Sequence, residues 1–553
     1  MNTKSVLQQQ RAAYQPKLPA ALWGNVKAVF GQPTESVADQ EKIKQLFPAT
    51  YGLPELTFEK ADESDDLRHP INVGVILSGG QAPGGHNVIS GLFDGLKSIH
   101  PESRLFGFLM GPDGLVNHLY IELTSDIVDE YRNTGGFDII GSGRTKLEKD
   151  EQFEKGRQIL EQLHINAVVI IGGDDSNTNA AVMADYYKRN NIPIQVIGCP
   201  KTIDGDLKNK FIETSFGFDT ATKVYSELIG NIECDCNSAK KYWHFIKLMG
   251  RSASHIALEC ALQTQPNYCV ISEEVEQKQM ALWDIVEDIT RVVLARAEQG
   301  MNYGTVLVPE GLIEFIPECK ELIQQLNELT AAEHQLKMAN MTPDEKVKYM
   351  CSHLTEKNKH TLNSLPDALG RQLMLERDPH GNVQVSLIET EKLLAACVAH
   401  NIQLLNEKRD KKSQIKFNAL HHFFGYEGRC AAPSNFDADY CYALGYNAAQ
   451  LVRSGVTGYM SSVRNLTKPS SQWIAGGVPI TMMMNIERRN GEDKPVIRKA
   501  LVDLEGHPFK EFAANREYWA ANTCYVYPGP IQYFGPAEVC DQPSRTLFFE
   551  QEA

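Results

Sequence analysis

The chain reads AVVIIGGDDS from Ala167 to Ser176, and one helix later it reads PKTIDGD from Pro200 to Asp206. In each case a short apolar run, rich in β-branched residues, leads into a loop with two aspartates. This order predicts two buried strands of a parallel sheet, with carboxylates at the strand ends where such sheets bind ligands. Carboxylates and a lysine that meet there suit Mg²⁺ bound to phosphate oxygens, with one carboxylate left as a base.

The flanking sequence repeats the order of strand, loop and helix. We predict further strands at Ile71–Leu77, Phe137–Ile140 and Ile194–Gly198, and helices at Val88–Ile99, Glu148–Leu163 and Asn177–Lys188. This alternation is typical of a doubly wound α/β fold. The loop after the first strand contains Gly79 and Gly80, which would let the backbone approach a phosphate closely. A plain tight turn explains that loop equally well.

The second half of the chain continues the same pattern with one interruption. Strands are expected at Tyr242–Leu248 and Thr305–Val308, and a helix at Ala281–Gln299. Residues 318–415 are charged, poor in glycine and mostly helical, so we expect an inserted helical subdomain whose charge runs face solvent. Glycine-rich sequence returns from Gly425 to Gly477.

The composition argues against several classes of protein. The chain has 553 residues and a formal net charge of −15, which is long enough for two domains and too acidic for a nucleic-acid partner. Its apolar runs are too short to span a bilayer, and its first residues lack the apolar segment of a secretory signal. The 12 cysteines are scattered, which favours reduced thiols. We therefore expect a cytoplasmic protein that binds neither nucleic acid nor membrane.

Each acidic loop has a structural explanation beside the functional one. Asp174 or Ser176 could cap the next helix, and Gly205 with Asp206 could form a Gly-Asp turn in which the carboxylates of the loop are solvated. In extended chain, however, Asp204 and Asp206 would share a face, where one could act as a general base toward a hydroxyl group. Lys201 could neutralise the charge on a transferring phosphoryl group.

The motifs occur together in an order that resembles the phosphofructokinase family. The chain contains, in sequence, SGGQAPG, GGDDS, PKTIDGD, MGR, PEG and GYEGR, and the resemblance covers residues from about 71 to about 470. Members of the family that use ATP generally have glycine at the positions of Asp175 and Lys201. The pair therefore resembles the pyrophosphate-dependent branch, and the N-terminal extension and helical insertion resemble its long subtype. The resemblance implies reversible phosphoryl transfer from Mg²⁺-pyrophosphate to the 1-hydroxyl of fructose 6-phosphate.

The resemblance also implies a role for each motif residue. Asp204 matches the base and Asp174 the Mg²⁺ ligand. Lys201 would bind pyrophosphate and stabilise the transition state, and Asp175 would exclude a nucleotide by occupying the space beyond its β-phosphate. Gly79 and Arg144 match positions near the phosphoryl donor. The implied sugar-phosphate contacts are Thr202, Ile203, Asp204, Asp206, Met249, Gly250, Arg251, Glu310, Tyr426, Glu427, Gly428 and Arg429, with Lys241 and Tyr242 reaching across a homodimer.

The same resemblance implies a domain organisation. We expect an N-terminal extension over residues 1–70 and a domain for pyrophosphate and Mg²⁺ over 71–217 plus about 427–475. A domain for the sugar phosphate would comprise residues 218–426 plus about 476–553 and would contain the insertion at 318–415.

Three alternatives remain beside this interpretation. The same fold could use ATP, although Asp175 argues against it. The chain could be a non-catalytic regulatory subunit, although such a subunit should have lost base or metal residues that are present here. It could also be another Gly-Gly-Asp kinase that acts on lipid or NAD, which the downstream MGR, PEG and GYEGR motifs disfavour.

Overall fold

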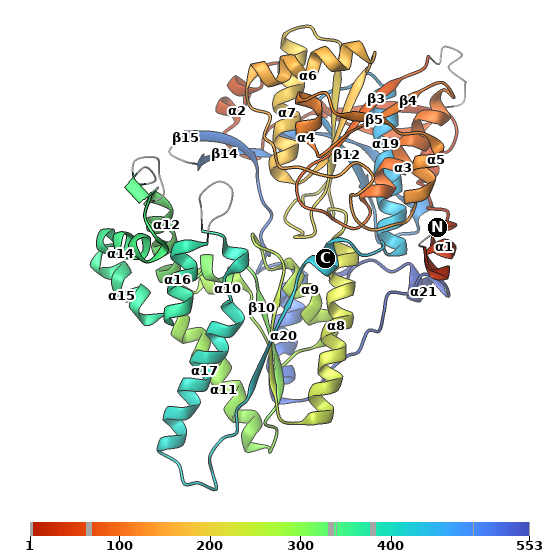
Figure 1. Ribbon diagram of the computed structural model, residues 1–553. Helices are drawn as coiled ribbons and strands as arrows, with labels where there is room; N and C mark the ends of the chain where they lie inside the picture. Colours follow the sequence, from red (N-terminus) through yellow and green to blue (C-terminus); the bar gives the residue numbers. More distant parts are fainter. Residues whose placement is uncertain are drawn as a thin grey trace. The chain divides into compact units, whose positions relative to one another are not determined.

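The computed structural model describes residues 4–61, 69–329, 334, 337–338, 340–376, 383–489 and 492–551. The chain divides into two compact units (Figure 1). Unit 1 comprises Met1–Val224, Tyr426–Ala500 and Ile531–Gln551, and unit 2 comprises Tyr225–Gly425, Leu501–Pro530 and Glu552–Ala553. Each unit contains a sheet with parallel strands at its centre, so the predicted α/β class is confirmed.

Unit 1 is built on a nine-stranded sheet. Its order is β1 (Val26–Pro33), β2 (Pro54–Lys60), β13 (Ile474–Pro479), β12 (Tyr459–Arg464), β7 (Gln195–Pro200), β6 (Ala167–Gly172), β3 (Asn72–Leu77), β4 (Arg104–Phe108) and β5 (Tyr120–Glu122). The strands from β12 to β4 are parallel, and those at both edges are antiparallel. Every residue of β6 is buried, because a central parallel strand is covered on both faces and therefore reads as a continuous apolar run.

Helices cover both faces of this sheet (Figure 1). On one face α3 (Gly85–Ile99) packs against α19 (Asn435–Arg453). A side chain at Gly91 or Gly445 would meet the backbone of the facing helix at about 2 Å, so glycine at these two positions permits the close approach of the helices. On the other face, Phe153 of α6 (Asp150–Gln162) and Tyr187 of α7 (Asp174–Arg189) enter the core.

Several smaller elements also belong to unit 1. They are α1 (Val6–Ala12), α2 (Gln40–Leu46), α4 (Pro112–Val116), α5 (Ser125–Tyr131), α18 (Tyr426–Arg429), α21 (Ala537–Cys540), α22 (Arg545–Gln551) and the hairpin of β14 (Met484–Arg489) and β15 (Glu492–Ile497). The strand predicted at Phe137–Ile140 is wrong, because this segment is a turn in which the Gly141 amide donates to the Phe137 carbonyl at 2.8 Å. Its apolar side chains are buried, and a short buried run does not by itself distinguish a turn from a strand.

Unit 2 contains a four-stranded parallel sheet in the order β11 (Ala419–Phe424), β8 (Trp243–Leu248), β10 (Gly304–Pro309) and β9 (Tyr268–Cys269). The helices associated with this part of the chain are α8 (Phe218–Ala239), which contains the first unit boundary, α9 (His255–Thr264), α10 (Ser272–Gln277), α11 (Leu282–Glu298) and α20 (His507–Ala521). The segment predicted as a helical insertion forms α12 (Pro317–Glu328), α14 (Pro343–His353), α15 (Glu356–Ser364), α16 (Asp367–Leu375) and α17 (Thr390–Glu407). Its buried leucines, among them Leu322, Leu373 and Leu394, belong to the core of unit 2.

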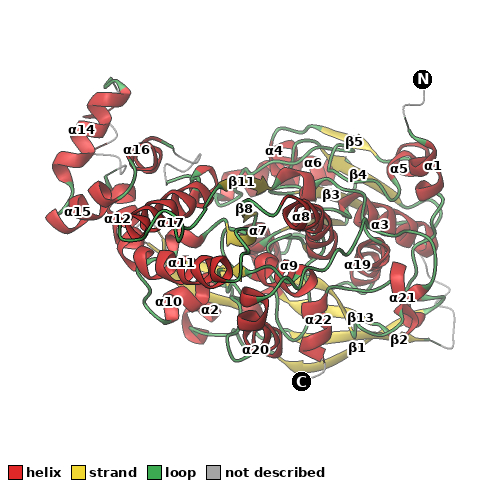
Figure 2. Ribbon diagram, turned by 90° about the horizontal axis from the view of Figure 1, so that it is seen from below, coloured by secondary structure: helices red, strands yellow, loops and turns green. Residues whose placement is uncertain are grey.

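The unit boundaries differ from the predicted domain boundaries at three main places, one of which is Ile531–Gln551, predicted in the sugar-phosphate domain and found in unit 1. Strands β1 and β2, from the expected N-terminal extension, continue the sheet of unit 1, where β2 pairs with β13 (Figure 2). Because β13 also pairs with β12, residues 476–500 remain in unit 1 and the chain enters unit 2 only at Leu501. Within the described ranges, no helix is both long enough and apolar enough to span a membrane.

Candidate functional site

The loops that carry the acidic motifs of unit 1 leave the sheet at neighbouring points. The Ser78 amide donates to the Ile171 carbonyl at 2.8 Å, and the Lys201 amide donates to the Gly172 carbonyl at 2.9 Å. Strands β3, β6 and β7 therefore end side by side, at their carboxyl ends. The Ser176 hydroxyl also donates to the Ser78 hydroxyl at 2.8 Å. This bond fixes the start of α7 against the loop after β3 that contains Gly79 and Gly80, here called the glycine loop.

The glycine loop leaves room for cations. An added Cβ at Gly80 would lie 1.9 Å from Nη1 of Arg429 and 3.7 Å from Nη2 of Arg144. At Gly79, whose φ is +84°, it would lie 3.3 Å from Nζ of Lys201. The structure thus brings three predicted cationic side chains to Gly79 and Gly80. They can approach this closely because glycine has no side chain.

The predicted metal ligand and donor-selective residue lie in a helix rather than in a loop. Helix α7 begins at Asp174, so Asp174 and Asp175 occupy its first turn, where the helix dipole favours negative charge. The side-chain amide of buried Asn177 donates to the carbonyls of Gly172 and Gly173 at 2.6 and 2.9 Å, which fixes the entry to the helix. Asp175 is exposed and Asp174 is partly exposed.

The PKTIDGD loop is held by its own hydrogen bonds. The Asp204 amide donates to the Thr202 hydroxyl at 3.1 Å, and the Ser215 hydroxyl donates to the Thr202 carbonyl at 2.9 Å. Gly205 has a φ of +75°, which most side chains disfavour. Ile203 is buried and serves as an apolar anchor.

Asp206 is buried within this loop, with 6% of its surface exposed. Burial and the negative charges of Asp204 and Asp174 raise the pKa of Asp206 to about 7, against an opposing attraction by Lys499. Asp206 is therefore partly protonated near neutral pH, which reduces the negative charge that the loop presents to a phosphoryl donor.

Lys201 is buried among charged groups of both signs. Burial and the positive charge of Arg429 lower the pKa of Lys201 to about 8, although Asp204 and Asp174 attract its charged form. A buried lysine whose pKa is lowered this far, and which is still charged near neutral pH, is characteristic of functional sites.

The structure adds Lys499, which none of the sequence motifs predicts. Its Nζ lies 3.7 Å from Oδ2 of Asp174 and 4.0 Å from Oδ2 of Asp206. Burial acts to lower the pKa of Lys499, but attraction by Asp174, Asp206, Asp204 and Asp175 raises it above the ordinary value. Lys499 follows the β14–β15 hairpin, far along the chain from the acidic loops, and no spacing signal in the sequence connects it with them.

A second group of predicted residues meets in unit 2. Strands β8 and β10 pair in parallel, with Leu248 opposite Pro309, so the residues that follow them are neighbours. The Gly250 amide donates to Oε2 of buried Glu310 at 2.9 Å. Gly311 lies against the Arg251 carbonyl, where an added Cβ would come within 1.9 Å. Met249, Gly250, Arg251 and Glu310 thus form one compact group.

Two other predicted contacts lie at the opposite end of the same strand. Tyr242 precedes β8, and Lys241 places its ammonium 5.2 Å from the centre of the Tyr242 ring. Since each strand residue advances the chain by about 3.3 Å, Tyr242 lies about 23 Å from Met249 along β8. Residues Tyr426, Glu427, Gly428 and Arg429 form α18, which belongs to unit 1.

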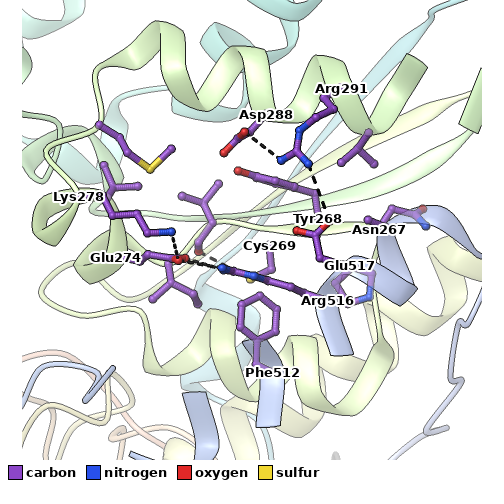
Figure 3. Close-up of a pocket in the computed structure, with 17 residues that line it drawn as sticks. Asn267, Tyr268, Cys269, Glu274, Lys278, Asp288, Arg291, Phe512, Arg516 and Glu517 are labelled. Atoms are coloured by element: carbon purple, nitrogen blue, oxygen red, sulfur yellow. Dashed lines mark hydrogen bonds and ion pairs between the residues drawn. The ribbon is translucent and has the colours of Figure 1, made fainter. Parts of the chain in front are cut away.

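Unit 2 also contains a cavity of about 300 Å³ beside β9, α10, α11 and α20 (Figure 3). Its cations are neutralised locally: Glu274 pairs with Arg516 at 2.6 Å and with Lys278 at 2.7 Å, and Arg291 pairs with Asp288 at 3.0 Å. An anionic substrate would have to displace these carboxylates. The cavity contains none of the motif residues, so we do not assign the phosphate chemistry to it.

Comparisons with known proteins agree with the motif geometry. A model of the phosphofructokinase family matches residues 72–452. A relative from Porphyromonas gingivalis, named pyrophosphate–fructose 6-phosphate 1-phosphotransferase, is 60% identical over 549 residues, 99% of each chain. A relative of the same name from Treponema pallidum is 54% identical over 99% of this chain and 97% of its own. The crystal structure of a pyrophosphate-dependent phosphofructokinase from Marinobacter aquaeolei matches with a TM-score of 0.53 and 16% identity, over 82% of this chain and 93% of that chain, which shows a likeness of fold.

Proposed function

Since the chain belongs to the phosphofructokinase family, we propose that it transfers a phosphoryl group from Mg²⁺-pyrophosphate to the 1-hydroxyl of fructose 6-phosphate, reversibly. The observation that carries the proposal is the arrangement around Gly79 and Gly80, where Lys201, Arg144 and Arg429 face the acidic loops. The names of the close relatives support the same donor and acceptor.

Asp204 is the proposed base, and Lys201 is the proposed stabiliser of the transferring group. Asp204 would accept the proton of the sugar 1-hydroxyl while the phosphoryl group moves to that oxygen. Lys201 would neutralise the charge that develops on the phosphoryl oxygens and on the departing phosphate. Asp175, exposed in the first turn of α7, would repel the α-phosphate of a nucleotide and so favour pyrophosphate.

Mg²⁺ fits this site as a companion of the substrate. The described ranges contain no group of three or more His, Cys, Asp or Glu side chains placed to hold a metal ion by themselves. Mg²⁺ is usually held by one or two carboxylates together with substrate phosphates. Asp174 supplies a partly exposed carboxylate, 24% of whose side chain is accessible. When bound, the metal would supply positive charge to the pyrophosphate oxygens.

The group in unit 2 is proposed to bind fructose 6-phosphate. Arg251 carries the charge that a phosphate requires, and its Nη2 lies 3.5 Å from Oε1 of Glu314 at a partly exposed position. Glu310 fixes the turn at Gly250 and could accept hydrogen bonds from sugar hydroxyls. Met249 would pack against the sugar. The sugar-phosphate contacts expected of Thr202, Asp206, Tyr426 and Arg429, which belong to unit 1, stay a prediction from the family resemblance.

The proposal includes a homodimer. Tyr242 and Lys241 lie at the end of β8 opposite to Met249, so a sugar phosphate held at Met249 could be reached by them only from a second copy of the chain. Mixing two inactive variants, one changed at Tyr242 and one at Arg251, should then restore activity in mixed dimers. Recovery of no activity, with mixed dimers demonstrated, would remove the shared site. The cytoplasmic location stays a prediction from the scattered cysteines.

The experiment that tests the function is a donor assay on the purified chain alone. Fructose 6-phosphate and Mg²⁺ are supplied with either pyrophosphate or ATP, and fructose 1,6-bisphosphate is measured. We expect turnover with pyrophosphate only. Turnover with ATP alone would overturn the donor assignment, and no turnover with either donor would favour a regulatory subunit.

A further inference from the structure

Lys499 occupies a position in unit 1 that no motif of the acidic loops predicts. Its ammonium lies between two carboxylates, 3.7 Å from Asp174 and 4.0 Å from Asp206. Both distances exceed those of a hydrogen bond, so Lys499 is attracted to the two carboxylates by charge and is not hydrogen-bonded to either. One of them is the proposed metal ligand, and the other adjoins the proposed base.

The backbone fixes this position from both sides of Lys499. The Ala500 amide donates to the Asp206 carbonyl at 2.7 Å, and the Arg498 amide donates to the Met483 carbonyl at 2.9 Å. The first of these bonds joins the segment directly to the acidic loop. The location of the ammonium therefore follows from the fold of unit 1, and one third of the Lys499 side chain, 33%, remains accessible.

The charges of the site favour a cation at this place. Four carboxylates, those of Asp174, Asp175, Asp204 and Asp206, act on Lys499, and a pyrophosphate brought among them would be repelled. Lys201, Arg144 and Arg429 lie at the glycine loop, whereas Lys499 lies at the carboxylates themselves. A strongly anionic donor would thus meet positive charge both from the cations at the loop and from Lys499.

We propose that Lys499 is a second pyrophosphate-binding lysine, which acts together with Lys201 and offsets the charge of Asp174 and Asp206 when the donor enters. This inference rests on the proposed function. Lys499 differs from Lys201 in being accessible, so its contribution should appear mainly in the affinity for pyrophosphate, while Lys201 should act mainly on the rate of transfer.

The test compares Lys499→Met, Lys499→Gln and Lys499→Arg with the wild-type chain and with Arg498→Met. Arg498 is the exposed neighbour in the same segment, so Arg498→Met is a matched removal of charge. KM for pyrophosphate and KM for fructose 6-phosphate are measured separately, together with kcat and the unfolding midpoint. We expect Lys499→Met and Lys499→Gln to raise KM for pyrophosphate about tenfold or more, and Arg498→Met to leave it within about twofold.

Two further readouts separate binding from a structural role. KM for fructose 6-phosphate should stay within about twofold in every Lys499 variant, and Lys499→Arg should recover part of the lost affinity because it keeps the charge. An unchanged KM for pyrophosphate in folded Lys499→Gln would overturn the inference, and so would an equal rise of both KM values with a lower unfolding midpoint. If the wild-type chain itself shows no turnover with pyrophosphate, the proposed function fails, and the inference fails with it.

Discussion

Replacing Lys201 by methionine separates two effects of this lysine, which are an increase in kcat and a decrease in the free energy of unfolding. The side chain is buried, with 6% of its surface exposed, and its Nζ lies at Gly79. Methionine has a similar length and no charge, so Lys201→Met removes the ammonium while largely keeping the packing. We expect the variant to be more stable than the wild type and almost inactive.

The stability effect follows from the pKa of Lys201. One pH unit of pKa difference corresponds to about 1.4 kcal/mol, so the lowering from 10.5 to about 8 means that the charged lysine destabilises the fold by roughly 3 kcal/mol. Because the folded pKa lies below the unfolded one, this cost is fully present below about pH 8 and is relieved as the pH rises toward 10.5. Lys201→Met should therefore raise the stability at pH 7 by about 1 to 3 kcal/mol, and the gain should shrink above pH 8.

The catalytic effect has the opposite sign. A unit charge about 4 Å from a phosphoryl oxygen contributes about 4 kcal/mol at an effective dielectric constant near 20, which corresponds to roughly a thousandfold in rate. We therefore expect Lys201→Met to lower kcat with pyrophosphate by about 10²- to 10⁴-fold.

The assay follows the formation of fructose 1,6-bisphosphate at saturating substrates, with thermal unfolding at pH 7 and pH 9.5. Lys188→Met is the matched control, because Lys188 is an exposed lysine near the end of α7, and it should change neither quantity appreciably. A kcat within about tenfold of the wild type would refute the role in the transfer. A loss of stability in Lys201→Met would refute the electrostatic account.

Three other results are expected. The kcat/KM for pyrophosphate should fall above about pH 8, where Lys201 loses its proton. This fall should be absent in an active Lys201→Arg variant, since arginine stays charged. An identical fall in the wild type and in Lys201→Arg would show that another group titrates. Asp204→Asn should lower kcat by about 10²- to 10⁴-fold with little change in KM for fructose 6-phosphate. A smaller loss of kcat in steady-state assays would favour Asp206 as the general base. Asp175→Gly should allow measurable turnover with ATP, because it removes a carboxylate from the first turn of α7, and a complete lack of ATP turnover in a variant still active with pyrophosphate would contradict the steric account of donor choice.

The sequence predicted the parts of the fold that local pattern determines. The predicted strand Ala167–Ile171 corresponds to β6, and the predicted helix Val88–Ile99 corresponds to α3. A continuous apolar run bounded by turn residues and a helical spacing of apolar residues each fit few other secondary structures. The strand predicted at Phe137–Ile140 failed because a segment of four residues, three of them buried, suits a turn as well as a strand. The antiparallel pairing of β13 with β2 joins segments from opposite ends of the chain, and no local pattern records it.

Prediction of the candidate site had the same limit. Residues adjacent to a strand end, such as Asp174, Lys201 and Glu310, could be named because the strand order brings them to one edge. Lys499 could not, because its relevance depends on a backbone hydrogen bond between Ala500 and Asp206.

The division of unit 1 into three separate segments bears on the order in which the chain acquires structure during synthesis. Strands β12 and β13 belong to its sheet, and they are translated only after the first segment of unit 2, Tyr225–Gly425. When β7 leaves the ribosome, its partner β12 does not yet exist, so the edge of β7 stays exposed throughout the synthesis of some two hundred residues of unit 2. Such an edge can pair with other chains, and a slow ribosome or an early stop within unit 2 should therefore promote aggregation more than the same event after Pro479.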